Sequence, residues 1–162
     1  MGSDDLDLAD SAVTALGRIG TDAVVGAISN AWEDGSDDFR GGAADVLEKI
    51  HTDPCVETCL RFLAAEDEFE TKLALGHAIL SHFSFEGIEP VRQLVLADEE
   101  ELEPDDFDVR NRLVAVATIM EIEFPELAAW HRDALENNWG WGEYKPHRLG
   151  DAFRPDAVAG DC

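Results

Sequence analysis

Basic residues, and lysine above all, are scarce in this chain of 162 residues. It has 12 Lys and Arg against 36 Asp and Glu, which gives a formal net charge of −24 at pH 7, and only three of the 12 are lysines. A field of this sign repels phosphate, which argues against binding to nucleic acid backbones and anionic membranes. A basic protein partner would instead be attracted. A high content of Asp and Glu with little lysine also resembles the composition of salt-adapted proteomes. Adaptation to salt is therefore a second interpretation of the charge.

Long apolar runs and a disulfide framework are missing as well. The longest apolar-rich stretch, residues 113–120, is far too short to span a bilayer, and the polar, acidic start carries no secretory signal. The three cysteines, Cys55, Cys59 and Cys162, are too few for a framework of disulfides. We therefore expect a cytoplasmic protein.

What the chain does have is apolar spacing typical of helices almost throughout. Hydrophobic residues make up 45% of the sequence, enough for a sizeable core, and no segment shows the sustained alternation of a strand. Gly20, the loop 34–37, Pro54, a turn at Glu86–Gly87 and a break near Pro125 divide the pattern into eight helices in four hairpins. The expected core residues are, in chain order, Leu8, Ala12, Leu16, Ile19, Val24, Val25, Ile28, Trp32, Phe39, Ala43, Val46, Leu47, Ile50, Val56, Cys59, Leu60, Leu63, Phe69, Leu73, Gly76, Leu80, Phe83, Ile88, Val91, Val95, Val109, Leu113, Val116, Ala117, Met120, Leu127, Trp130 and Ala134.

Equivalent positions recur along the chain at a repeat-like interval. Leu16, Leu47, Leu80 and Ile119 are separated by 31, 33 and 39 residues, and the longest interval contains the acidic insertion 98–108. A repeat of about 30–40 residues with two helices in each unit is typical of an α-solenoid. The sequence therefore predicts an all-α fold, an α-α superhelix (solenoid) of about four helical hairpins.

The first repeat makes this prediction more specific. Its sequence AVTALGRIG at 12–20, followed by AVVGAI at 23–28, resembles the short HEAT-like repeat also found in bilin-lyase-type proteins. The starts Asp-Phe-Arg at 38–40 and Asp-Val-Arg at 108–110 are similar to that family's Asp-Val-Arg, whereas Glu-Phe-Glu at 68–70 departs from it. The resemblance implies a right-handed superhelix of HEAT-like hairpins with a concave binding face, usually for protein.

These patterns suggest three regions. Residues 1–137 form the HEAT-like α-solenoid, 138–154 an aromatic C-terminal cap or hook, and 155–162 a disordered tail. Within the solenoid, the segment 98–108 holds eight carboxylates. We favour a solvated loop over a hook for a basic partner or a divalent cation there, and the oxygen-ligand spacing of a calcium-binding EF-hand is absent.

The cysteines and histidines do not form a recognisable metal motif. Cys55 and Cys59 lie four residues apart on one predicted helix, and a metal would need two more ligands, but Pro54 separates His51 from that helix. We interpret both cysteines as small buried core residues.

The other two central histidines also have simpler explanations than a site. His77 and His82 are five residues apart and do not share a helix face. We place His77 near the edge of the core stripe, while His82 could pair with Glu86 on the surface.

Catalytic motifs are missing. The sequence has no Gly-x-Ser-x-Gly elbow, no phosphate-binding loop, and none of the His-Glu dipeptides that hold iron in the HEAT-like deoxyhypusine hydroxylases. We therefore expect no enzyme, no cofactor and no metal.

The leading hypothesis is a non-enzymatic protein–protein interaction module with a strongly acidic surface, whose partner is another protein, possibly a basic one. An alternative is an acidic immunity or antitoxin-like protein that neutralises a basic toxin, and a third is a tetrapyrrole-handling protein similar to bilin lyases. The candidate partner-binding residues, on a concave face formed by the second helices and in the aromatic C-terminal segment, are Trp32, Arg61, Arg92, Trp130, Trp139, Trp141 and Tyr144.

Overall fold

The computed structural model describes the backbone of residues 3–97 and 107–137, and the side chains of 11–97 and 108–136. In these ranges the chain forms eight α-helices and no strand, which confirms the predicted all-α class. The helices are α1 (Ser3–Ile19), α2 (Asp22–Ala31), α3 (Asp37–Glu48), α4 (Asp53–Ala65), α5 (Phe69–Ser81), α6 (Phe85–Ala97), α7 (Phe107–Ile119) and α8 (Leu127–Asn137). None of these helices has the length and apolar character needed to cross a membrane.

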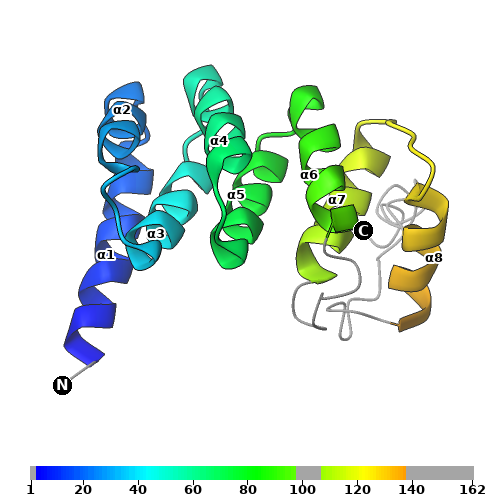
Figure 1. Ribbon diagram of the computed structural model, residues 1–162, viewed down its shortest axis with the longest axis horizontal. Coiled ribbons are helices and arrows are strands. Elements are labelled where there is room, and N and C mark those ends of the chain that lie inside the picture. The colour runs from blue at the N-terminus through cyan, green and yellow to red at the C-terminus, as the bar shows by residue number, and fades with distance from the viewer. Residues whose placement is uncertain (1–2, 98–106, 138–162) are drawn as a thin grey trace, which may run out of the picture.

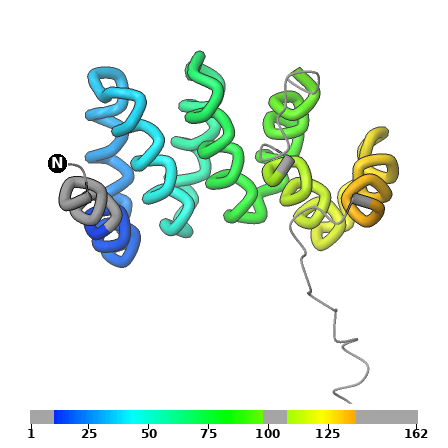
Figure 2. Tube along the Cα trace, turned by 90° about the horizontal axis from the view of Figure 1, so that it is seen from below, coloured from blue at the N-terminus to red at the C-terminus, as the bar shows by residue number. Residues whose placement is uncertain are grey.

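The helices stack as successive hairpins in two layers. In the layer of first helices, α1 contacts α3, α3 contacts α5, and α5 contacts α7; in the layer of second helices, α2 contacts α4 and α4 contacts α6. Figures 1 and 2 show the hairpins following one another along the long axis of the molecule. This packing is consistent with a solenoid, and the superhelical twist implied by the HEAT resemblance stays a prediction.

Several helix boundaries lie where the local sequence predicts them. Gly20 follows α1 with a φ of 56°, the left-handed conformation that glycine adopts without strain. The Ser36 side chain caps α3 by accepting a hydrogen bond from the Phe39 backbone N–H. Pro54 lies in the first turn of α4, where the missing N–H costs nothing. Thr21 occupies the N-cap of α2 without a side-chain hydrogen bond.

The turn inside the third hairpin was predicted too late in the sequence. Helix α6 already begins at Phe85, so Glu86 and Gly87 lie in its first turn rather than in a loop. The chain reverses at 82–84, where Phe83 has a φ of 51°. Phe83, predicted as a core residue, lies in this turn and is exposed.

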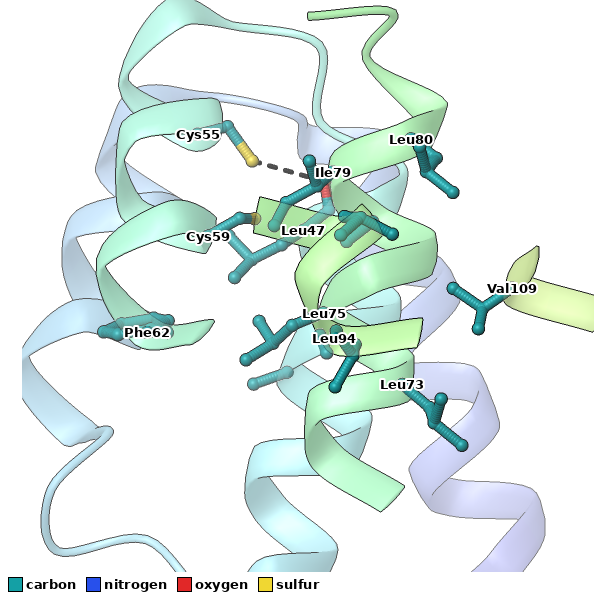
Figure 3. Close-up of a cluster of buried hydrophobic side chains, with 14 of the residues drawn as sticks. Leu47, Cys55, Cys59, Phe62, Leu73, Leu75, Ile79, Leu80, Leu94 and Val109 are labelled. Atoms are coloured by element: carbon teal, nitrogen blue, oxygen red, sulfur yellow. Dashed lines mark hydrogen bonds between the residues drawn. The ribbon is translucent and has the colours of Figure 1, made fainter. Parts of the chain in front are cut away.

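One hydrophobic cluster runs through the stack, from Val24 in α2 to Trp130 in α8. Its centre is α5, where the fully buried Leu75 and Ile79 lie opposite side chains of neighbouring helices (Figure 3). This continuous core confirms that successive hairpins share one lengthwise apolar seam. The burial of Leu94 in α6 extends the same seam toward the C-terminal hairpins.

Some predicted core positions face outward. Leu16 and Ile19 are exposed because α1 is the first helix of the stack and has a neighbour on one side only, and Ile119 is exposed at the last position of α7. Phe39, in the first turn of α3, is 40% exposed. The buried face of α4 is also rotated from the predicted one. That face consists of Cys55, Thr58, Cys59 and Phe62, whereas Val56, Leu60 and Leu63 are only half-buried.

Replacing two helical glycines by alanine is expected to change the stability of the fold in opposite directions. A Cβ added at Gly87 would lie 2.2 Å from Ile79 Cγ2, so Gly87→Ala forces α5 and α6 apart and is expected to cost about 1–3 kcal/mol. A Cβ at Gly26, inside α2, meets nothing within 4 Å. Gly26→Ala is therefore the matched control, and is expected to stabilise the fold by about 0.5–1 kcal/mol. Urea unfolding of both variants measures the difference, and equal stability for the two would contradict the close packing of α5 on α6.

Candidate functional site

A groove of about 510 Å³ crosses three consecutive first helices, α3, α5 and α7. Each helix contributes residues from a single face, because positions three, four or seven apart lie above one another on a helix. The lining residues are Asp45 and Glu48 from α3, Glu70, Leu73, Ala74 and His77 from α5, and Asp108 and Arg112 from α7. The direct contacts of α3 and α7 with α5 therefore assemble the groove from three separate stripes.

Arg112 joins the three helices at the bottom of the groove. Its Nη1 donates a hydrogen bond to Glu48 Oε1 at 2.7 Å and lies 3.1 Å from His77 Nδ1. The Ser81 hydroxyl donates to the same Glu48 oxygen at 2.9 Å. On the other side of the imidazole, His77 Nε2 is 3.8 Å from Asp108 Oδ2. This network holds the register between α3, α5 and α7.

The protonation states in the groove favour negative charge. Burial alone would raise the pKa of Glu48, but the hydrogen bonds from Arg112 and Ser81 lower it below its ordinary value. Burial lowers the pKa of His77, an effect that the nearby Asp108 only partly offsets. At pH 7 the imidazole is therefore neutral, and the lining carries four carboxylates against one guanidinium.

Trp32 and Trp130, predicted both as core residues and as partner contacts, lie in the core. Trp32 is 6% exposed and stacks on Phe62 of α4, with ring centroids 3.9 Å apart. Trp130 is 4% exposed and meets the ring of Phe124 edge to face at 5.7 Å. Both side chains thus offer almost no surface to a partner, because the apolar stripe on which they lie is the packing face of their helices.

The two predicted arginines contact neighbouring hairpins. Arg61, exposed on α4, donates from Nη2 to the hydroxyl of Ser29 in α2 at 2.7 Å. Arg92 on α6 donates from Nε and Nη2 to the carboxylate of Glu126, ahead of α8, at 2.7 and 2.8 Å. It also pairs with Glu89 on its own helix. These arginines bridge successive second helices, and Arg61 is exposed.

The remaining predicted contacts, Trp139, Trp141 and Tyr144, lie outside the described residues. The same holds for the acidic segment 98–106 and the tail 155–162.

A second cluster, built from thiols and an imidazole, was missed by the sequence analysis. Cys55 and Cys59 are fully buried on α4, as predicted, but His82 from the C-terminus of α5 joins them. His82 Nε2 lies 3.7 Å from Cys55 Sγ, and the Cys55 thiol donates to the Leu47 carbonyl at 3.2 Å (Figure 3). The predicted surface pair of His82 with Glu86 is thus replaced by a contact with the interior.

The two thiols of this cluster differ in acidity. A hydrogen bond from the Cys59 thiol lowers the pKa of Cys55, and the His82 side chain adds to the effect, although burial opposes it. The same hydrogen bond and burial raise the pKa of Cys59, so that one thiol ionises well before the other. A sulfur with this acidity is a good ligand for soft cations, but its complete burial keeps it from an external substrate.

No family model matches the chain, and neither does any curated protein or solved structure. The likeness to short HEAT repeats therefore stays a prediction from the residues of the first repeat.

Proposed function

We propose that this chain is a non-catalytic protein-binding module, and that the groove across α3, α5 and α7 binds a basic segment of its partner. The observation that carries this proposal is the lining of four carboxylates against one guanidinium. A protein surface of one sign raises the encounter rate with a partner of the opposite sign and fixes its orientation. The proposed occupant is a segment with two or three lysine or arginine side chains.

The charge of the whole chain supports the same partner chemistry. With a formal net charge of −24, the molecule repels nucleic acid phosphates at long range and attracts basic proteins. At short range the groove supplies carboxylates from three helices, and the hydrogen bond from Arg112 to Glu48 joins α7 to α3. Long-range attraction and local recognition therefore favour the same kind of ligand.

A binding role suits the chemistry of the described residues better than a catalytic one. Cys55 is the most acidic thiol among them, but it is 0% exposed and faces a backbone carbonyl. His77 contacts the positively charged Arg112, which disfavours its protonation and weakens it as a general base.

Because Cys55 and Cys59 lie together as free thiols, we also propose that the protein works in a reducing compartment, the cytoplasm.

The test is a selection of peptides from a random display library against the full-length chain. The enriched sequences should be rich in lysine and arginine. Their affinity should fall about tenfold or more when two groove carboxylates are neutralised by Asp45→Asn with Glu70→Gln, since tenfold corresponds to about 1.4 kcal/mol.

The matched control removes the same charge elsewhere. Glu33 and Asp34 are exposed in the loop between α2 and α3, so Glu33→Gln with Asp34→Asn changes the net charge equally but leaves the groove intact. Measured by fluorescence anisotropy, affinity should change little in this variant. Equal weakening in both double variants would assign binding to overall charge, and enrichment of neutral or acidic peptides would reject a basic partner.

A further inference from the structure

The cluster of Cys55, Cys59 and His82 has the donor set and the spacing of a metal site. The two cysteines lie one turn apart on the buried face of α4, and His82 is the C-cap residue of α5. Because α4 packs on α5, these residues converge although 27 residues separate Cys55 from His82. Their ligand atoms, two sulfurs and one ring nitrogen, all lie within 4.8 Å of one another.

The distance between Cys55 and His82 suits a tetrahedral cation. A zinc ion bound at roughly 2.3 Å from sulfur and 2.0 Å from nitrogen places its ligand atoms about 3.5–3.8 Å apart along the edges of the tetrahedron. The separation of 3.7 Å between Cys55 Sγ and His82 Nε2 is such an edge. Two thiolates and an imidazole are soft to intermediate ligands, which select Zn²⁺ over the hard cations Mg²⁺ and Ca²⁺.

We propose that Cys55 Sγ, Cys59 Sγ and His82 Nε2 bind one Zn²⁺ ion, with a solvent molecule in the fourth position. On binding, the two S–H bonds break and both protons pass to solvent, while the imidazole keeps its proton on Nδ1. The ion would fasten the second hairpin to the third, since α4 and α5 belong to different hairpins. This site is separate from the groove and does not depend on the function proposed above.

The metal would replace an existing set of hydrogen bonds. The Cys55 thiol donates to the Leu47 carbonyl, and His82 Nε2 lies 3.2 Å from the same oxygen. That carbonyl also accepts from the Ile50 backbone N–H, so it keeps a partner when the thiol and imidazole turn to a cation. Without metal, the polar groups of the cluster are thus hydrogen-bonded. With metal, the Leu47 carbonyl still has a hydrogen-bond donor.

His82 is the proposed ligand closest to solvent. His82 is only partly buried, and the exposed ring of His51 meets it edge to face with centroids 5.1 Å apart. Both histidines lie next to helix termini at the same end of their hairpins, His82 after α5 and His51 before α4. We therefore expect the ion to reach the two buried sulfurs from the end where His82 lies.

The experiment is a titration of the reduced full-length chain with Co²⁺, followed by competition with Zn²⁺. The expected result is one equivalent of Co²⁺ with intense tetrahedral d–d bands and thiolate-to-cobalt charge transfer, both of which Zn²⁺ abolishes. Cys59→Ser and His82→Gln should each weaken binding at least tenfold. Two controls, His131→Gln at an exposed histidine of α8 and Cys162→Ser, should bind as the wild type does.

Absorption from carboxylate-bound cobalt is weak, so the many acidic residues of the chain do not imitate this signal. Weak bands only, or binding unchanged in both Cys59→Ser and His82→Gln, would overturn the proposal. If these variants do not fold, X-ray absorption spectroscopy of the zinc-loaded wild type tests the site through the types of ligand and their distances from the metal. Two sulfurs at about 2.3 Å and a nitrogen at about 2.0 Å support the site, and a shell of oxygen alone rejects it.

Discussion

Trp32→Ala is expected to lower the free energy of unfolding by about 3–5 kcal/mol, one of the largest losses that a single truncation in this chain can cause. The indole lies at the end of α2 and stacks on Phe62 of α4 at an interplanar angle of 11°. It therefore joins the first hairpin to the second. Truncation removes both the buried apolar surface and the ring contact, and the stacked pair alone contributes about 0.5–1.5 kcal/mol beyond the buried area.

Trp32→Phe is the matched variant, because it keeps an aromatic ring against Phe62 and shortens only the indole. Its loss should be clearly smaller than that of the alanine variant. Chemical denaturation followed by circular dichroism measures both losses. A cost below about 0.5 kcal/mol for Trp32→Ala is typical of a surface position and would return Trp32 to the list of partner contacts.

The sequence predicts the number of helices and many of their ends for local reasons. Glycine and proline act through their own backbone, so Gly20 after α1 and Pro54 in the first turn of α4 could be placed without knowing the fold. The turn at 82–84 was missed because Phe83 adopts a positive φ that sequence does not suggest for phenylalanine. Local rules are therefore reliable where the residue itself imposes the conformation.

The sides that helices present to one another are harder to predict. On α4 the apolar pattern allowed a face through Val56 and Leu60, but the structure buries the face through Cys55 and Phe62. The choice between such faces depends on the neighbouring helix, here α5, and not on the spacing within α4. Trp32 was predicted both as a core residue and as a partner contact, and the packing of α2 on α4 shows that it is buried.

Both candidate sites depend on packing between helices. The stripe of Glu70 and His77 on α5 could be recognised from its spacing of seven residues, but its position opposite Glu48 of α3 follows only from how the helices pack. Likewise, nothing in the sequence places His82 beside Cys55. The sequence therefore suggested an acidic binding protein, and the structure adds the place where carboxylates of three helices meet.

Leu75→Ala is expected to destabilise the fold by about 2–5 kcal/mol, because it opens a cavity at the centre of the stack. Leu75 is 0% exposed in α5, the helix that contacts α3, α4, α6 and α7. If the hairpins share one core, this loss should lower the urea midpoint of the whole helical signal in a single transition.

The control for this variant is Leu135→Ala in α8, where the side chain is 70% exposed and the expected change is within about 0.5 kcal/mol. Both variants are followed by circular dichroism and, independently, by amide hydrogen exchange. In a shared core, Leu75→Ala accelerates exchange in α3 and α7 as well as in α5, since all three helices lose packing through the same cavity. Acceleration confined to α5 and α6 would instead mean that each hairpin is stable by itself, and the groove formed by α3, α5 and α7 would then lack the common support that its geometry requires.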